Sequence, residues 1–218
     1  MVTFRVRRCC ILEKFTYYFW TFMLGSILGV IIETIWCVLR YRKIESRKGL
    51  IYGPFNPLYG FATMCLSLCI NCVTNKGAGN IFIIGVVVAS VIEYLCSYYQ
   101  EKFTGAVSWN YDKFKFNLNG RINLVYSIFW GLLTLVWYNS FMPLIDEFMI
   151  TIDSHVSLTV FSVIFIAFDC FISLAATVRR KHRRENIEAK TKFEKHLDSV
   201  YTDKILDWVY PNSQVVDD

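Results

Sequence analysis

Three carboxylic acids lie inside otherwise apolar stretches of this sequence: Glu33, Glu93 and Asp169. Burying such an acid in membrane hydrocarbon is costly, so acids of this kind face a protein interior or a water-filled cavity. Two of them end the same pattern, in which small residues precede the acid at every fourth position. The two patterns are Gly25, Gly29, Glu33 and Gly85, Ala89, Glu93. On a helix each pattern forms one stripe along which a second helix can approach closely, so we expect both acids to point into seams between helices.

The elements that position these acids have the length of membrane spans. Apolar residues make up 55% of the 218 residues, against about 45–50% in soluble domains. Five apolar stretches separate the clusters of Lys and Arg, and each is close to the ~20 residues that a helix needs to cross a bilayer. They are residues 15–39, 55–73, 80–99, 122–142 and 157–178. The second is the weakest, because it begins at Asn56-Pro57. The sequence predicts an all-α polytopic membrane protein with about five transmembrane helices, in which residues 1–180 form the transmembrane domain.

Residues 181–218 are predicted to form a cytosolic tail. A basic cluster, Arg179 to Arg184, opens it and is typical of a stop-transfer anchor that attracts anionic lipid. Apolar residues then recur at helical spacing until Pro211, which predicts an amphipathic helix. They are Phe193, Leu197, Val200, Tyr201, Ile205 and Trp208. This helix could lie on the membrane, pack on the cytosolic loops or dock a partner. No nucleic-acid partner is expected, because the basic run adjoins a span.

The basic residues also predict the orientation. If the C-terminus is cytosolic, 18 of the 23 Lys and Arg residues lie inside, as the positive-inside rule requires. The four basic residues of the N-terminus, at positions 5, 7, 8 and 14, are then translocated. A re-entrant second segment would remove that conflict.

Two polar segments adjoin the predicted spans on the cytosolic side. The first, residues 47–60, reads RKGLIYGPFNPLYG. It cannot form a regular helix, because its prolines lack backbone donors and its glycines admit positive φ. It serves either as a rigid, backbone-lined access route to a site or as a loop that turns the chain. The residues on which this interpretation depends are Gly49, Gly53, Pro54, Pro57, Tyr59 and Gly60.

The second segment, residues 101–122, mixes aromatic, amide and charged residues, including Tyr111, Asn117 and Gly120. It ends at Arg121, at the start of the fourth predicted span. A guanidinium there could pair with a carboxylate or bind an anion. It could equally extend to the lipid headgroups.

The acids Glu33 and Glu93 are expected close to the two polar segments, because all of them lie toward the cytosolic side of the membrane. Glu33 and Glu93 lie roughly 10 Å from the cytosolic ends of their spans, at the rise of an α-helix. We therefore predict one polar vestibule, open to the cytosol, with Glu33, Glu93 and Arg121 as its main groups and Tyr111 and Asn117 as further candidates. Asp169 either joins this vestibule or forms a separate proton or ion site. The first and third spans would be equivalent members of two helical hairpins, as in some transporters.

No metal or cofactor is expected. The eight cysteines lie mostly inside spans, where Cys behaves as a small apolar residue. Cys65, Cys69 and Cys72 share one helix face, but no His accompanies them.

Several of these motifs resemble one family, the bacterial CmpB-like proteins described as putative ABC transporter permeases of type IV. The matching pieces occur in order between about residues 25 and 143, and GPFNPLYG and FNLNGRI are the most specific. The others are Glu33 with Trp36, the run Ser90 to Tyr94, Glu101-Lys102-Phe103, and Phe129-Trp130-Gly131 before Pro143. The family pattern Trp-Trp-Asp-Tyr is replaced here by Ser108-Trp109-Asn110-Tyr111. The resemblance implies a multi-pass protein of the bacterial inner membrane and names no substrate.

The leading functional hypothesis is a membrane-spanning component of a transport system. No G-x-x-x-x-G-K-[ST] motif occurs, so an ATP-driven system needs a separate ATPase subunit, docked on residues 40–48 and 102–121. A homo-oligomer is also possible. The alternatives are a membrane assembly, regulatory or sensing protein and an intramembrane enzyme acting on lipid headgroups. No catalytic motif supports the enzyme, so we expect the chain not to be one.

Overall fold

The chain is mainly helical. The computed structural model describes residues 2–152 and 156–216, with side chains from residue 12 onward, so the side chains of the N-terminal arginines at positions 5, 7 and 8 lie outside the described part. The helices are α1 (Val2–Tyr41), α2 (Pro57–Cys72), α3 (Ala78–Thr104), α4 (Leu124–Val136), the π-helical turn η1 (Trp137–Phe141), α5 (Met142–Ile152), α6 (Val156–Arg184), α7 (Lys192–Val200) and α8 (Asp203–Val209). Two short antiparallel strand pairs complete the fold, β1 (Ala106–Val107) with β4 (Gln214–Val215) and β2 (Asn117–Leu118) with β3 (Ile122–Asn123).

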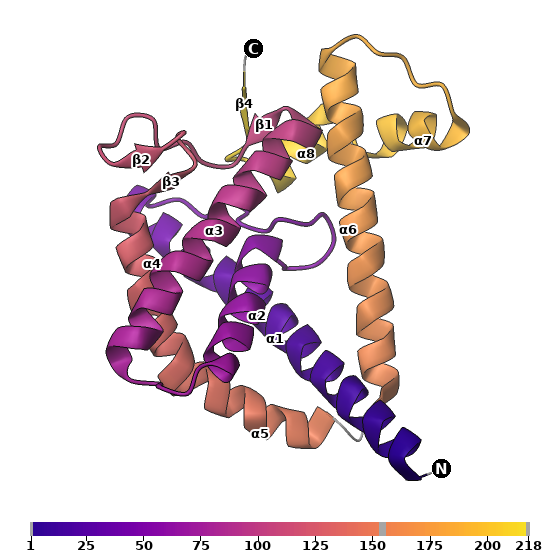
Figure 1. Cartoon of the computed structure of the whole chain (residues 1–218). Coiled ribbons are helices and arrows are strands. Elements are labelled where there is room, and N and C mark those ends of the chain that lie inside the picture. Colours follow the sequence, from indigo (N-terminus) through magenta and orange to yellow (C-terminus); the bar gives the residue numbers. More distant parts are fainter. Residues whose placement is uncertain (1, 153–155, 217–218) are drawn as a thin grey trace.

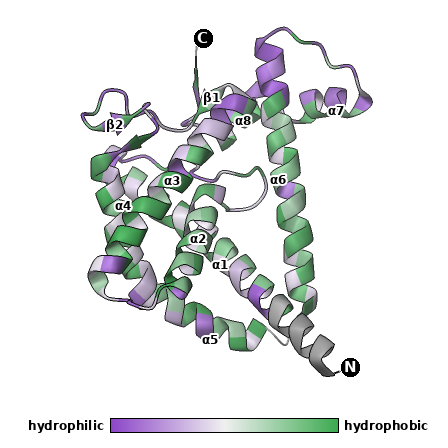
Figure 2. Cartoon of the chain, viewed as in Figure 1, coloured by the Kyte–Doolittle hydropathy of each residue, from purple (hydrophilic) through white to green (hydrophobic). Residues whose placement is uncertain are grey.

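Four helical segments are long and apolar enough to cross a membrane. They are Leu12–Tyr41 of α1, Ala78–Thr104, the continuous run Leu124–Ile152, and Val156–Arg184. Figure 2 shows that these helices consist mainly of hydrophobic residues, with most of the hydrophilic residues at the end of the bundle that carries α7 and α8. The predicted all-α polytopic architecture is confirmed. The count of five spanning helices is not, because the second predicted span is the 16-residue helix α2, shorter than the ~20 residues needed.

Helices α1 to α4 form two antiparallel hairpins, α1 with α2 and α3 with α4 (Figure 1). Small residues let the helices of each pair approach closely. A Cβ atom added to Gly29 would lie 2.2 Å from Cγ of Tyr59, and one added to Gly85 would lie 2.4 Å from Oγ1 of Thr134. The stripe that precedes each acid therefore faces the second helix of its own hairpin.

This packing makes Gly29 sensitive to substitution. We expect Gly29→Ala to destabilise the protein by about 1–3 kcal/mol, the usual effect of overpacking, because the new methyl group collides with the ring of Tyr59. Thermal unfolding of the detergent-purified protein measures the effect. Gly79→Ala is the matched control, because a Cβ at Gly79 has no neighbour within 4 Å. Equal unfolding temperatures for the two variants would contradict the close packing of α1 and α2.

The helix that begins at Leu124 continues further than the predicted span 122–142. It passes through η1 and ends at Ile152, so much of the expected loop after residue 142 is helical. Its direction changes near η1, and α5 runs across the end of the bundle that carries the N-terminus (Figure 1). Kinks of this kind arise at π-turns and prolines, and Pro143 lies two residues after the end of the turn. The indole of Trp137, in η1, is buried and donates to Oγ of Ser67 at 3.0 Å.

Residues 42–56 connect α1 to α2 by running back into the bundle. The amide of Asn56 donates to the carbonyl of Ser26 at 3.2 Å, and Ser26 lies about 22 Å along α1 from Tyr41. Helix α2 therefore begins beside the middle of α1. The non-helical residues 42–56 and the helix α2 together cover the length of the bundle. Helix α2 is short because it covers only part of that length. Figure 1 shows this connection reaching toward the middle of α6.

The amphipathic tail forms two short helices, α7 and α8, instead of one continuous helix. Thr191 and Glu194 form a capping box at the start of α7, and the chain leaves helical geometry at Tyr201 before α8 begins. Of the six apolar residues that predicted the helix, Leu197 and Tyr201 are buried against Ile51 and α6, whereas Phe193, Val200, Ile205 and Trp208 are exposed. This cluster contains Leu197, Tyr201, Leu206, Val209, Ile172 and Ala176. Of the three possibilities for the tail, packing on the polar end of the bundle is the one observed.

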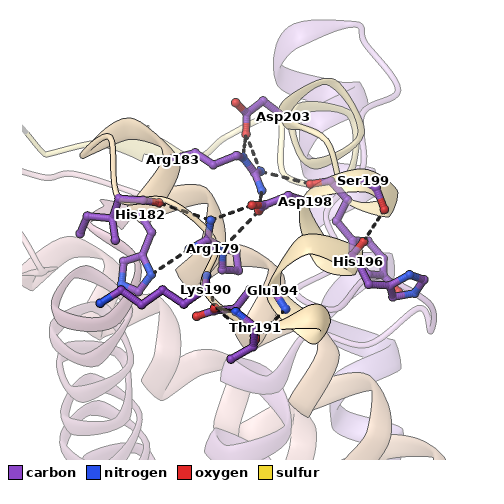
Figure 3. Close-up of polar contacts among 12 residues, drawn as sticks. Arg179, His182, Arg183, Lys190, Thr191, Glu194, His196, Asp198, Ser199 and Asp203 are labelled. Carbon is purple, nitrogen blue, oxygen red and sulfur yellow. Dashed lines mark hydrogen bonds and ion pairs between the residues drawn. The ribbon is translucent and has the colours of Figure 1, made fainter.

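Ion pairs fix the tail to the end of α6 (Figure 3). Arg179 binds Asp198 through two nitrogens, Nε at 3.2 Å and Nη2 at 2.7 Å. Arg183 bridges Asp198 and Asp203, each at 2.6 Å, and Arg180 pairs with Asp207. Three arginines of the basic cluster thus bind tail carboxylates, in addition to any contact with lipid.

Asp198 is the centre of this arrangement. We expect Asp198→Asn to speed tryptic release of the tail roughly fivefold, equivalent to about 1 kcal/mol for partly exposed ion pairs. Asp207→Asn is the control, because its side chain is 65% exposed and its pair should contribute little. Equal cleavage rates for wild type and Asp198→Asn would show that apolar packing alone holds the tail.

The same contact has a defined dependence on pH. Hydrogen bonds from Arg179, and then from Arg183, hold the pKa of Asp198 below its usual range. A carboxyl with a lowered folded-state pKa stabilises the fold above its unfolded pKa of about 3.9. That contribution is lost as the pH falls through the folded-state value. Peptic cleavage of the tail should therefore accelerate below about pH 4.

Candidate functional site

A cavity of about 970 Å³ opens between the two hairpins, α6 and the tail. Twelve aromatic side chains line it, so most of its wall is apolar. Both Glu33 and Glu93 line it as well. Tail residues, among them Tyr210 and Asn212, close part of its rim. That this cavity is the predicted polar vestibule stays a prediction.

Aromatic donors hold each of the two acids. Glu33, on α1, accepts a hydrogen bond from the hydroxyl of Tyr59 at 3.0 Å. Glu93, on α3, is 4% exposed. Its Oε1 accepts from the hydroxyl of Tyr111 at 3.1 Å, and its Oε2 accepts from the indole nitrogen of Trp130 at 2.9 Å.

The two hairpins repeat this arrangement. In each, the first helix carries the acid and the second helix supplies an aromatic donor, Tyr59 from α2 for Glu33 and Trp130 from α4 for Glu93. The rings of Tyr59 and Trp130 lie 5.3 Å apart between centroids. The hairpins therefore meet at the donors, and the two carboxylates flank one aromatic contact.

Tyr111 reaches Glu93 from outside the spans, on the segment between α3 and α4. Burial, followed by the nearby Glu93 carboxylate, raises the pKa of the Tyr111 hydroxyl. The hydroxyl therefore keeps its proton at neutral pH and acts as a donor. Its ring stacks on Tyr126 with a centroid distance of 4.8 Å, which fixes its orientation.

Arg121 lies elsewhere. Its Nη1 pairs with Glu101 at 2.7 Å, and its guanidinium lies over the rings of Tyr94 and Tyr98. Among the described residues it does not line the cavity. Arg121 thus pairs with a carboxylate, as one of the sequence-based interpretations allowed, but with Glu101 and not with either vestibule acid. The guanidiniums found in the cavity wall are those of Arg47, Arg180 and Arg184.

Asn117 and Gly120 shape the segment that presents Tyr111. The side-chain amide of Asn117 donates to the carbonyl of Phe114 at 2.7 Å, and its oxygen accepts from the amide of Gly120 at 2.9 Å. Gly120 has a φ of +65°, a conformation that favours glycine. The carbonyl of Gly120 accepts from the amide of Tyr111 at 2.7 Å. These two residues position Tyr111 and do not contact Glu93.

Asp169 forms a separate feature, on α6 and fully buried. Its Oδ1 accepts from the amide of Tyr52 at 3.1 Å and its Oδ2 from the amide of Gly53 at 2.7 Å. Ser173, one turn later, accepts from the amide of Ile51 at 2.9 Å. Asp169 therefore supplies hydrogen-bond acceptors to the backbone of the 42–56 connection. Non-helical backbone inside a membrane protein needs such partners.

The residues that contact the acids were only partly visible in the sequence. Tyr59 stood out as part of a turn motif and Trp130 as part of the family resemblance, but no spacing rule links either to an acid 26 or 37 positions away. Across the described part of the chain, no group of three or more His, Cys, Asp or Glu residues is arranged to hold a metal ion.

The fold and the site together define a polytopic helical membrane protein with paired acids in an aromatic internal cavity. The chain belongs to the family described as "Putative ABC-transporter type IV", whose model matches residues 20–174. The match runs from α1 well into α6 and leaves the tail outside. No curated protein and no solved structure matches the chain.

Proposed function

We propose that this chain is the membrane-spanning subunit of an ABC-type transport system and that the cavity is its substrate site. The observation that carries the proposal is the pair of acids, Glu33 and Glu93, facing one large cavity inside an apolar bundle. Acids at this depth in a membrane protein are typical of substrate and ion pathways. The broken passage formed by residues 42–56 and α2 adds a feature that transporters use around their binding sites.

The proposal includes an orientation in a bacterial inner membrane. The end of the bundle with the tail, the 42–56 connection and residues 105–123 carries most of the basic residues. The positive-inside rule assigns such an end to the cytoplasm. The cavity then opens toward the cytosol, and the N-terminus lies at the opposite end of the bundle (Figure 1).

ATP hydrolysis is assigned to a partner, because the sequence has no P-loop motif. Residues 40–48 and 102–121 lie at the proposed cytosolic end and are the surface on which an ATPase subunit would dock. Co-expression of the chain with the ATPase encoded nearest to its gene tests this. We expect the two to copurify and the ATPase rate to rise in the complex. Absence of both effects would refute the ABC-type role.

One observation favours a second role, that of a regulatory or sensing protein. The tail is held over the cavity rim by ion pairs and contributes Tyr210 and Asn212 to the lining. A ligand in the cavity could thus change how the tail sits. Ligand-dependent protection of the tail from trypsin, without any ATPase partner, would support this role over transport.

A further inference from the structure

Within the described part of the chain, Glu33 and Glu93 line the cavity without an ion pair of their own. Among the ion pairs of the described residues, none involves Glu33 or Glu93. Their hydrogen bonds come from a phenol or an indole, which are neutral donors. Neutral donors stabilise a carboxylate without cancelling its charge, so a cation placed between the two acids is attracted by both.

The rings around these acids suit a particular kind of cation. The faces of Tyr, Trp and Phe attract cations, and cages of such rings recognise quaternary ammonium groups. Here Tyr59 and Trp130 are in contact between the two acids, and Tyr111 with its stacked partner Tyr126 lies beside Glu93. A small hydrated metal ion gains little from such a wall, whereas an apolar cation gains both burial and charge pairing.

We infer that the cavity binds a hydrophobic organic cation, an amine or onium group carried on an apolar or aromatic body. This inference deepens the proposed function. It rests on that function only where it treats the bound cation as a transport substrate. The volume of about 970 Å³ lies within the ~300–1,000 Å³ of sites that enclose drug-sized ligands. The charge-bearing atom would lie between Glu33 and Glu93, and the body would lie against the aromatic wall.

Basic residues at the rim do not oppose this assignment. Arg180 is paired with Asp207, and Arg184 donates to the carbonyl of Thr104 at 2.7 Å. Arg47 pairs with Glu45 at 3.3 Å and also interacts electrostatically with Glu33, though the two form no ion pair. Lys48, the fourth cation of the lining, donates to the carbonyl of Ile51. Each of these four cations has a partner of its own, whereas Glu33 and Glu93 accept hydrogen bonds from neutral donors alone.

The direct test compares two probes of the same shape and opposite charge, tetraphenylphosphonium and tetraphenylborate. Binding of each to the purified full-length chain in nanodiscs is measured by equilibrium dialysis, with the uptake of empty nanodiscs subtracted. We expect the cation to bind at least about tenfold more tightly than the anion, a difference of about 1.4 kcal/mol. Equal affinities, or tighter binding of the borate, would overturn the inference.

Variants then locate the site. Glu33→Gln and Glu93→Gln should each weaken phosphonium binding at least about tenfold, because each removes a buried charge partner. Glu147→Gln, which removes an exposed carboxylate on α5, should leave binding unchanged. Wild-type affinity in the double glutamine variant would refute the site. If a variant does not fold, the comparison of the two probes on wild type still decides the question.

The results also separate this inference from the transport proposal. If phosphonium binding depends on the two carboxylates but no ATPase is stimulated, the inferred cationic ligand is supported and the transport role is refuted. If an ATPase is stimulated but the cationic and anionic probes bind equally well, the transport role is supported and the inferred cationic ligand is refuted.

Discussion

Asp169→Ala is expected to destabilise the protein by about 3 kcal/mol or more, because hydrogen bonds to a charged group contribute about 1.5–3 kcal/mol each. The substitution leaves the amides of Tyr52 and Gly53 without their acceptor inside the bundle. At the size of this chain, the expected fall in unfolding temperature is roughly 6–12 °C. Thermal unfolding of the detergent-purified protein, followed by size-exclusion chromatography, measures it.

A graded series tests the assigned cause. Asp169→Asn keeps one oxygen acceptor and should lie between wild type and Asp169→Ala. Ser173→Ala removes the acceptor of the Ile51 amide and one donor to Asp169, and it should cost about 1–2 kcal/mol. If Asp169→Ala were as stable as wild type but lost activity, Asp169 would be a proton or ion site and not an anchor for the connection.

Glu93→Gln is expected to abolish substrate-dependent activity of the complex while the protein still folds and reaches the membrane. Glutamine has the same shape as glutamate. Its oxygen can accept from the indole of Trp130, and its amide can donate to the hydroxyl of Tyr111, so both partners stay satisfied. What is lost is the negative charge that faces the cavity. Substrate-stimulated ATPase activity of the reconstituted complex is the measurement.

Two companion variants complete this experiment. Glu93→Ala should lower stability as well as activity, because it leaves the buried donors of Trp130 and Tyr111 unpaired, at about 1–3 kcal/mol for each such group. Glu147→Gln controls for the loss of one carboxylate at an exposed position. Full activity in Glu93→Gln would reduce this acid to a hydrogen-bond acceptor and remove the main support for the substrate site.

The membrane architecture was predictable because it depends on local quantities. Hydrocarbon excludes charge over a fixed thickness, so apolar stretches bounded by Lys and Arg reveal spans without any tertiary information. The stripe of small residues before each acid was equally informative, since helix periodicity alone places Gly25, Gly29 and Glu33 on one face. Both stripes face a partner helix in the structure.

The short helix α2 shows where local reasoning stops. Residues 55–73 are apolar enough to look like a span, but whether the preceding chain stays outside the bundle or enters it depends on distant partners. Asp169 and Ser173 supply those partners from more than 115 residues away. The same distance explains why Asp169 looked like a possible ion site in the sequence.

The composition of the cavity is likewise a tertiary property. Position along a helix predicted that Glu33 and Glu93 lie at similar depth, but not which aromatic rings would contact them or that Arg121 would bind Glu101 instead. Hydropathy and charge are properties of single residues, so the sequence alone determines them. The choice of partner for a buried carboxylate depends on how helices rotate and pack, and only the assembled bundle decides that.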